Sequence, residues 1–167
     1  CSGCGLVQLN NEPVPYYKEV IRASAFSEEM GRYRQTQFRK FVENNSLQGK
    51  KVIEIGTGKG EYLSLMRECG VDTYGVEYSQ ESVNACRASG LNVQKEYIDS
   101  PSCSLSDAPY DAFFIMNFFE HVPDPSSMLR GIYNNLAPGA VGLVEVPNFD
   151  MVLKGKLFHQ ENPDFNS

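Results

Sequence analysis

The sequence predicts an α/β domain in which an open parallel sheet is covered by helices on both faces. Three observations predict this fold class. From residue 51 onward, short apolar segments of strand length alternate with amphipathic segments of helix length. Residues 112–116 are nearly all apolar, as expected of a central parallel strand that is buried on both faces. Gly70 and Gly90 follow two of the helical segments, where helices commonly end.

The first part of the chain is expected to stand apart from the sheet. Residues 1–15 form a loop-like, cysteine-containing segment, and residues 16–48 form a helical segment. Within the latter, helical apolar spacing predicts a helix over residues 26–44, with Ser27 as its N-cap. Its apolar positions are Met30, Tyr33, Phe38, Phe41 and Val42, and its basic residues Arg32, Arg34, Arg39 and Lys40 are interpreted as a solvated surface.

The sheet and its helices are expected within residues 49–150. Strands joined by helices of this size imply parallel pairing with crossover connections. The expected strands are residues 52–55, 73–76, 92–98, 112–116 and 141–146, and the helices between them are residues 61–69, 80–89 and 126–136.

Composition and charge exclude several classes of protein. The 167 residues suit one domain, and 41% hydrophobic with 22% charged residues is ordinary globular composition. The net charge of -6 argues against a nucleic-acid binder, because phosphate affinity requires clustered Lys and Arg. No apolar run is long enough to span a bilayer, so no membrane association is expected. Five cysteines without a disulfide-like framework predict a reducing, cytoplasmic location.

A glycine loop follows the first expected strand. Gly56, Thr57, Gly58 and Gly60 stand between that strand and a helix. Open α/β sheets bind ligands beyond the carboxyl ends of their strands, and glycine lets a ligand approach the backbone there. A tight turn without a ligand is the alternative, but three alternating glycines exceed what a turn requires. The loop therefore predicts a nucleotide-type ligand.

The residues around the loop favour S-adenosylmethionine (SAM) over a dinucleotide. A dinucleotide fingerprint places its third glycine three residues after the second, and its helix N-terminus faces a diphosphate. Here Glu61 opens the helix, and its carboxylate would repel a diphosphate. Glu54 is placed to help hold the SAM ammonium group. Glu77 ends the second strand, where a carboxylate accepts hydrogen bonds from ribose hydroxyls; this role suits SAM and NAD equally.

Over roughly residues 49–148 the chain resembles the class I SAM-dependent methyltransferases, which have a Rossmann-like core. Val52-Ile-Glu-Ile-Gly-Thr-Gly-Lys-Gly60 resembles the family's first motif and Tyr74-Gly-Val-Glu-Tyr-Ser79 its acidic second motif. The segments Tyr110-Asp-Ala-Phe-Phe-Ile-Met-Asn-Phe-Phe-Glu-His-Val-Pro123 and Leu136-Ala-Pro-Gly139 resemble the fourth-strand motif and the approach to the fifth strand.

The resemblance implies roles for particular residues. The glycines would pass close to the methionine and ribose parts of SAM, and Tyr78 would lie along the adenine. Tyr97 and Ile98 would contact the adenine, and Asp99 is either an acceptor for the adenine amino group or a plain loop carboxylate. Asn117 and Phe118 would line the site of methyl transfer, which leaves S-adenosylhomocysteine (SAH) as product.

The candidates for acceptor chemistry follow the fourth strand. Glu120, His121 and Asn117 lie where an acceptor should sit. Histidine is the side chain best suited to a proton transfer near neutral pH, whereas a structural histidine that packs near Pro123 is the competing interpretation. Glu120 is expected to fix the loop or His121 rather than act as the base. The other histidine, His159, is expected to be an exposed tail residue more readily than part of an acceptor pocket.

Cys1 and Cys4 resemble half of a zinc site, such as the Cys-rich region that precedes the core in some methyltransferases of sugar carbons. A structural zinc site requires four ligands, so zinc is expected only with residues upstream of this chain, and no metal site is expected in the chain alone.

The acceptor is expected to be a small molecule, with a sugar or a nucleotide-linked sugar as the first candidate. Two rival functions stay open: an NAD(P)-binding oxidoreductase domain, and a SAM-binding module without turnover. The family's sheet ends in two further strands that are not found before Ser167, so a truncated sheet and fragment ends are expected. The sequence does not distinguish a monomer from a dimer.

Overall fold

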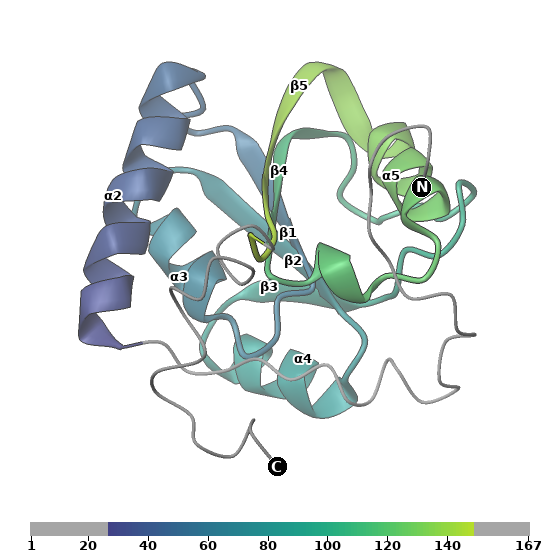
Figure 1. The fold of residues 1–167 in the computed structure, drawn as a ribbon, viewed down its shortest axis with the longest axis horizontal. Coiled ribbons are helices and arrows are strands. Elements are labelled where there is room, and N and C mark those ends of the chain that lie inside the picture. Colours follow the sequence, from purple (N-terminus) through teal and green to yellow (C-terminus); the bar gives the residue numbers. More distant parts are fainter. Residues whose placement is uncertain (1–26, 149–167) are drawn as a thin grey trace.

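The computed structural model describes residues 27–148 and shows one five-stranded sheet in the order β3-β2-β1-β4-β5, with every pairing parallel (Figure 1). The predicted fold class is confirmed over this range. The strands are β1 (Lys51–Ile55), β2 (Asp72–Glu77), β3 (Asn92–Lys95), β4 (Tyr110–Met116) and β5 (Leu136–Glu145).

The strand order reverses in the middle of the sheet. β1 pairs with β2 on one side, where Glu54 lies opposite Gly75, and with β4 on the other, where Glu54 lies opposite Phe114. The chain therefore proceeds from β1 to β2 and β3 in one direction and then returns to start β4 on the opposite side of β1. In such sheets the crevice outside the carboxyl ends of the central strands is the expected ligand site.

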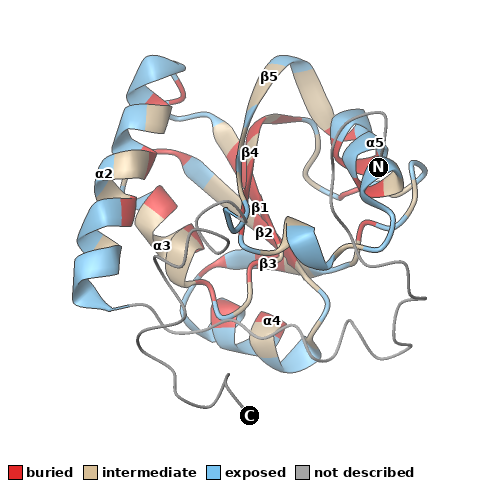
Figure 2. Cartoon of the chain, viewed as in Figure 1, coloured by how far each residue is buried: buried red, intermediate tan, exposed pale blue. Residues whose placement is uncertain are grey.

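Helices cover both faces of this sheet (Figures 1 and 2). Side chains of three helices share one apolar cluster with β1 and β4, and those of the fourth share a second cluster on the opposite face with the segment after β3. The three are α2 (Glu28–Asn44), α3 (Glu61–Arg67) and α4 (Gln80–Ala88), and the fourth is α5 (Pro125–Asn134).

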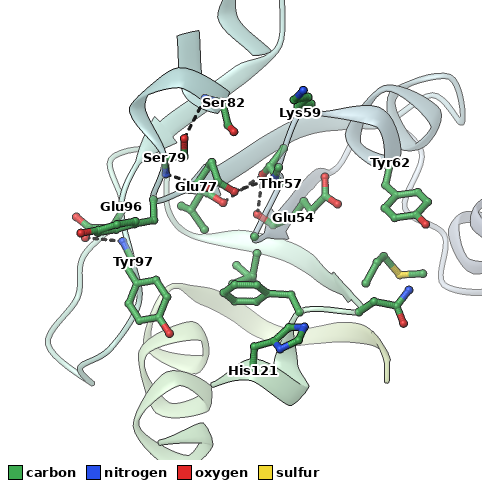
Figure 3. A pocket seen from close by; sticks show the side chains of 18 of the residues that line it. Glu54, Thr57, Lys59, Tyr62, Glu77, Ser79, Ser82, Glu96, Tyr97 and His121 are labelled. Atoms are coloured by element: carbon green, nitrogen blue, oxygen red, sulfur yellow. Dashed lines mark hydrogen bonds between the residues drawn. The ribbon is translucent and has the colours of Figure 1, made fainter. Parts of the chain in front are cut away.

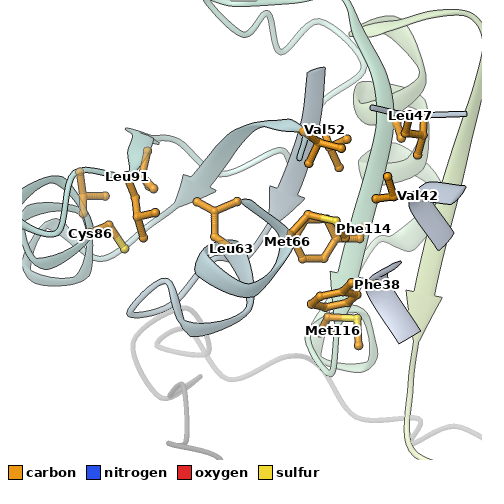
Figure 4. Close-up of a cluster of buried hydrophobic side chains, with 14 residues drawn as sticks. Phe38, Val42, Leu47, Val52, Leu63, Met66, Cys86, Leu91, Phe114 and Met116 are labelled. Carbon is orange, nitrogen blue, oxygen red and sulfur yellow. The ribbon is translucent and has the colours of Figure 1, made fainter. Parts of the chain in front are cut away.

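Helix α2 packs through a narrower stripe than its sequence predicts. Ser27 caps it as expected, by accepting a hydrogen bond from the Met30 amide. Phe38 and Val42 are fully buried, and the Phe38 ring lies 5.4 Å from that of Phe114 (Figure 4). Arg34 is the third buried residue of the helix, at 4% exposure, so its interpretation as solvated surface was wrong.

The exposed side of α2 carries two of the predicted apolar positions. Met30 is 39% exposed and Tyr33 is 59% exposed. The helix therefore buries positions 34, 38 and 42, which are spaced by four residues along one face.

Several predicted boundaries were wrong. Helix α3 ends at Arg67 rather than at residue 69, and β4 begins at Tyr110 rather than at residue 112. The third strand ends at Lys95 and not at residue 98, because the Glu96 carboxylate accepts a hydrogen bond from the Tyr97 amide and the chain then leaves the sheet. Helix α5 ends at Asn134, because the buried side chain of Asn135 binds the backbone of Leu105 and Cys103 and turns the chain into β5.

Strand β5 accordingly begins at Leu136 rather than at residue 141. Pro138 and Gly139, expected in a loop, lie inside it where the pairing with β4 shifts register between Tyr110 and Ala112. Proline is tolerated in a strand at such an irregularity.

Several predictions fall outside this range or stay untested. Cys1, Cys4, His159 and the expected segments 1–15 and 151–167 lie outside the described residues, and the predicted domain boundaries stay predictions. Within residues 27–148 no helix is long and apolar enough to cross a membrane, and no three His, Cys, Asp or Glu side chains are grouped to hold a metal ion.

Candidate active site

A pocket of about 810 Å³ opens at the carboxyl ends of β1, β2 and β4. Its volume lies in the range of small-molecule and cofactor sites. Figure 3 shows Glu96 and Tyr97 at one end, Tyr62 at the other, and Glu54 and Glu77 between them. Of the predicted site residues, the pocket brings together Glu54, Gly56, Thr57, Gly58, Glu77, Tyr78, Tyr97, Ile98, Asn117, Phe118, Glu120 and His121.

The glycine loop is folded tightly against β2. The amides of Gly56 and Thr57 both donate to the Val76 carbonyl oxygen, at 3.0 and 3.1 Å. The buried Thr57 hydroxyl donates to the same oxygen at 3.2 Å. Gly56 has a φ of +79°, and a Cβ atom there would lie 2.6 Å from the Phe118 ring. Only glycine lets the chain take this turn while Phe118 lies directly against it.

Gly60 does not line the pocket. It is the N-cap residue of α3, with a φ of +87°, and a Cβ atom would meet the side chain of Leu91 at 2.4 Å and that of Cys86 at 3.0 Å. The loop glycines therefore differ in function: Gly56 and Gly58 face the pocket, whereas Gly60 allows α3 to pack closely on α4 and the following turn.

Glu77 is held by backbone donors on both sides. Its Oε2 accepts from the Gly58 amide and its Oε1 from the Ser79 amide, each at 2.8 Å (Figure 3). The carboxylate thus connects the glycine loop to the start of α4. Each carboxylate oxygen keeps a further lone pair for a hydroxyl donor.

Glu54 is a buried carboxyl group, 1% exposed, and its Oε2 has no hydrogen-bond partner among the described residues. Burial raises the pKa of Glu54 well above its ordinary value, and the nearby carboxylates of Glu61 and Glu77 raise it further. A buried acceptor without a partner is costly unless a ligand satisfies it. The group is therefore suited to a cationic donor that enters the pocket.

The pocket as a whole is acidic. Among the lining residues that the structure describes, Lys59 is the one lysine or arginine and His121 is the one histidine. Such a surface favours a cationic ligand and repels a diphosphate. The carboxylates that line it are Glu54, Glu61, Glu77, Glu81, Glu96 and Glu120.

Aromatic side chains form the end of the pocket beyond β2 and β3. The Tyr78 and Tyr97 ring centroids lie 6.1 Å apart, and those of Tyr97 and Phe118 lie 6.3 Å apart, both edge to face. Ile98 is buried beneath them. Asp99 is not among the lining residues, whereas its near neighbour Glu96 is.

Three polar side chains follow β4 on the opposite wall. Asn117 has a φ of +50°, a left-handed conformation that asparagine adopts more readily than most residues. Glu120 and His121 lie in a short 3-10 turn, Phe119–His121, with 3.9 Å between Glu120 Oε1 and His121 Nε2. His121 is half-exposed and faces the pocket across from the glycine loop (Figure 3).

Sequence reasoning did not assign a site role to several lining residues. Ser79 and Ser82 belong to the start of α4, and the Ser79 hydroxyl accepts the Ser82 amide hydrogen as an N-cap. Their signal was present, because an N-cap serine directly after Glu77 belongs at the same sheet edge. Tyr62, Met116 and Met128 carry no such signal, since apolar helix and strand residues ordinarily indicate core.

The sequence profile of the methyltransferase domain family matches residues 30–164. The chain belongs to this family. The family resemblance of the sequence is thereby confirmed, and the arrangement of loop, strand ends and pocket described above is this family's fold in the present chain.

The methyltransferase relatives include two ubiquinone biosynthesis O-methyltransferases. The one from Aliivibrio fischeri is 29% identical over 163 residues, which are 90% of this chain and 69% of the relative. The one from Bordetella avium is 34% identical over 99 residues, 56% of this chain and 41% of the relative. The chain thus spans well under the full length of both relatives.

Solved structures share the fold at low sequence identity. The plantazolicin methyltransferase BpumL, in complex with a monoazolic desmethylPZN analog and SAH, has a TM-score of 0.64 at 19% identity, covering 76% of this chain and 52% of that one. A SAM-dependent methyltransferase from Clostridium acetobutylicum has a TM-score of 0.60 at 16% identity, covering 83% and 58%.

Proposed function

We propose that the protein binds SAM in this pocket and transfers its methyl group to a hydroxyl group of an uncharged small molecule. The observation that carries the proposal is the buried Glu54 Oε2, which has no hydrogen-bond partner within residues 27–148 and lies at the centre of an acidic pocket. The relatives named as O-methyltransferases support transfer to oxygen.

The residues present fit the ammonium, ribose and adenine groups of SAM. Glu54 would accept from the ammonium group, and the oriented carboxylate of Glu77 from the ribose hydroxyls. Gly56 and Gly58 leave room for the methionine and ribose, and Tyr78, Tyr97 and Ile98 form an aromatic and apolar end suited to the adenine. When bound, SAM supplies an electrophilic methyl group on a sulfonium.

The chain's own contribution to transfer is alignment and proton removal. Methyl transfer is an in-line displacement, so holding both reactants in place supplies much of the acceleration. Asn117 and Phe118 would border the transfer site. His121 would remove the hydroxyl proton, because its half-exposed ring faces the pocket and Glu120 Oε1 lies 3.9 Å from its Nε2, close enough to orient the ring.

The charge of the pocket favours an uncharged acceptor over a nucleotide-linked sugar. Within the described part of the chain, a nucleoside diphosphate would meet several carboxylates and a single lysine. The same repulsion disfavours the NAD(P)-binding alternative. A free sugar hydroxyl or a phenol hydroxyl carries no such penalty.

The cofactor is tested by calorimetric titration of the full chain with SAM, SAH, NAD and NADP. We expect binding of SAM and SAH only, and a loss of about tenfold or more in SAM affinity for Glu77→Ala, because hydrogen bonds to a charged group contribute about 1.5–3 kcal/mol. Asp72→Ala, at the exposed opposite end of β2, is the matched control and should bind SAM normally. Binding of NAD in preference to SAM would reject the proposal.

The reaction is tested with methyl-labelled SAM and three acceptors of contrasting chemistry: catechol, a methyl hexoside and a nucleoside diphosphate sugar. We expect transfer to an uncharged acceptor and its loss in His121→Ala but not in the control Asp107→Ala, which lies at the other end of the sheet. Tight SAM binding without transfer to any of them would favour a binding module.

A further inference from the structure

Arg34 is a buried cation on a helix that precedes the sheet. Its Nη1 and Nη2 both bind the Glu145 carboxylate, a bidentate pair, and Nη1 also donates to Gln37 Oε1 at 2.8 Å. The Arg34 side chain is 5% exposed and that of Glu145 is 29% exposed. Bidentate pairing of this kind fixes geometry as well as charge. Neither residue lines the pocket.

Glu145 connects this pair to the wall of the pocket. It is the last residue of β5, lies opposite Met116 in the sheet, and its carbonyl oxygen accepts the Asn117 amide hydrogen at 3.0 Å. The Arg34 guanidinium holds the pKa of the Glu145 carboxyl below its ordinary value, and Asn117 contributes in the same direction. The main chain of Asn117 is therefore fixed by the residue that pairs with Arg34.

The Arg34 guanidinium also contacts a residue on the α3 side of the pocket. Its central carbon lies 5.5 Å from the centroid of the Tyr62 ring, close enough for a cation–π contact. Tyr62 lies in the first turn of α3. Both Tyr62 and Asn117 line the pocket. One buried cation thus touches Tyr62 directly and Asn117 through Glu145.

Helix α2 does not depend on Arg34 for its attachment. Phe38 and Val42 are buried in the apolar cluster together with Phe114 (Figure 4). The Phe38 ring also packs near those of Phe114 and Tyr62, with centroids 5.4 and 6.3 Å away. Removing the Arg34 charge therefore leaves the apolar seam of the helix in place. What it releases is Glu145, whose carbonyl oxygen binds the Asn117 amide.

We propose that Arg34 is a positioning residue for methyl transfer, which sets Asn117 through Glu145 and Tyr62 through direct contact at the acceptor side of the pocket. This inference rests on the proposed function. It assigns α2, which contributes no lining residue, to the machinery of the site. It also explains why an arginine occupies the apolar face of that helix.

The test compares Arg34→Met and Arg34→Lys in the full chain with Arg32→Met. Arg32 pairs with Glu28 on the solvated side of the same helix, with side chains 68% and 90% exposed. The double variant Arg34→Met/Glu145→Gln removes both charges, and so keeps the test valid if the single variant leaves Glu145 uncompensated and unfolds.

The first readout is the backbone amide signal of Asn117 in ¹⁵N NMR spectra, which requires no acceptor. We expect it to shift in every Arg34 variant and to stay unchanged in Arg32→Met. With the acceptor found by the labelled-SAM assay, we expect kcat to fall about tenfold or more in Arg34→Met, because small misplacements at a reacting centre are costly. SAM affinity should stay near that of the wild type, and Arg34→Lys should fall between the two.

Folded Arg34 variants with wild-type Asn117 signals and wild-type kcat would overturn the inference. Arg34 would then serve only to attach α2 to the sheet. A parallel loss of SAM affinity and kcat would also overturn it, since the effect would then spread over the whole pocket. Failure of the wild-type protein to bind SAM would instead reject the proposed function, so the two failures are distinct.

Discussion

Glu54 couples the stability of the ligand-free protein to pH. Its pKa is raised in the folded state by burial and by the carboxylates of Glu61 and Glu77, so the folded protein holds this proton more tightly than the unfolded chain. The contribution to stability is fully present below the unfolded pKa of about 4.3 and is lost as the pH rises through the raised folded value.

We therefore expect Glu54→Gln to be more stable than the wild type at neutral pH, with the difference shrinking as the pH falls toward the unfolded pKa. Thermal unfolding at a series of pH values, without ligand, measures this. Saturating SAM should reverse the order, because the ammonium group then compensates the carboxylate. If the unfolding temperatures of the two ligand-free proteins depended on pH in the same way, the assignment of Glu54 as a buried acid with a raised pKa would be contradicted.

Individual residues were predictable where the sequence places them at a defined point of the sheet. Glu77 was predicted as a site residue because it ends the strand that follows the glycine loop and its helix. Asn117, Glu120 and His121 were predicted because they follow the next central strand. Arg34 was not, because an arginine in a helix is ordinarily solvated and its partner, Glu145, lies 111 residues away in the sequence. A long-range ion pair leaves no periodic signal.

At the scale of elements, the loop between β1 and α3 is predicted to tolerate no side chain at Gly56. Gly56→Ala would strain a φ of +79° and drive Cβ into the Phe118 ring. We expect a loss of about 1–3 kcal/mol in the free energy of unfolding, together with weaker SAM binding. Chemical denaturation and calorimetric titration measure the two effects.

Gly90→Ala separates strain from collision. Gly90 has a φ of +72°, but no atom lies within 4 Å of the position of an added Cβ. This variant should carry only the backbone penalty, about 1 kcal/mol, and should bind SAM like the wild type. Equal losses of SAM affinity in the two variants would show that the Phe118 contact does not shape the site.

The elements that were misjudged share a physical cause. Strand β3 stops at Lys95 and α5 at Asn134 because side chains of Glu96 and Asn135 capture nearby backbone groups. Periodicity reports which face of an element is buried, whereas termini depend on such local hydrogen bonds. Tyr97 and Ile98 nevertheless reach the pocket, because the chain that leaves the sheet continues along its carboxyl edge.

The architecture of the whole molecule was the most predictable feature. Alternating strands and helices permit few topologies, because crossovers between parallel strands have one preferred hand and sequential strands tend to be neighbours. The order β3-β2-β1-β4-β5 places the carboxyl ends of β1, β2 and β4 together. It thereby brings Glu54, Glu77 and Asn117 into one site, although the first and last are 63 positions apart in the sequence.

The charge of this assembled site predicts how the protein distinguishes SAM from its product. SAH lacks the sulfonium charge, and between residues 27 and 148 six carboxylates line the pocket against one lysine. We expect SAM to bind more tightly than SAH at low salt. The ratio of the SAH dissociation constant to the SAM dissociation constant should decrease as added salt shortens the screening length from about 30 Å at 0.01 M to about 3 Å at 1 M. Glu61→Gln removes one carboxylate from the first turn of α3. This variant should have a smaller ratio of the two dissociation constants at low salt, and its ratio should depend less on salt. Calorimetric titrations of both ligands across this range measure it, and a ratio independent of salt in both proteins would mean that shape rather than charge separates substrate from product.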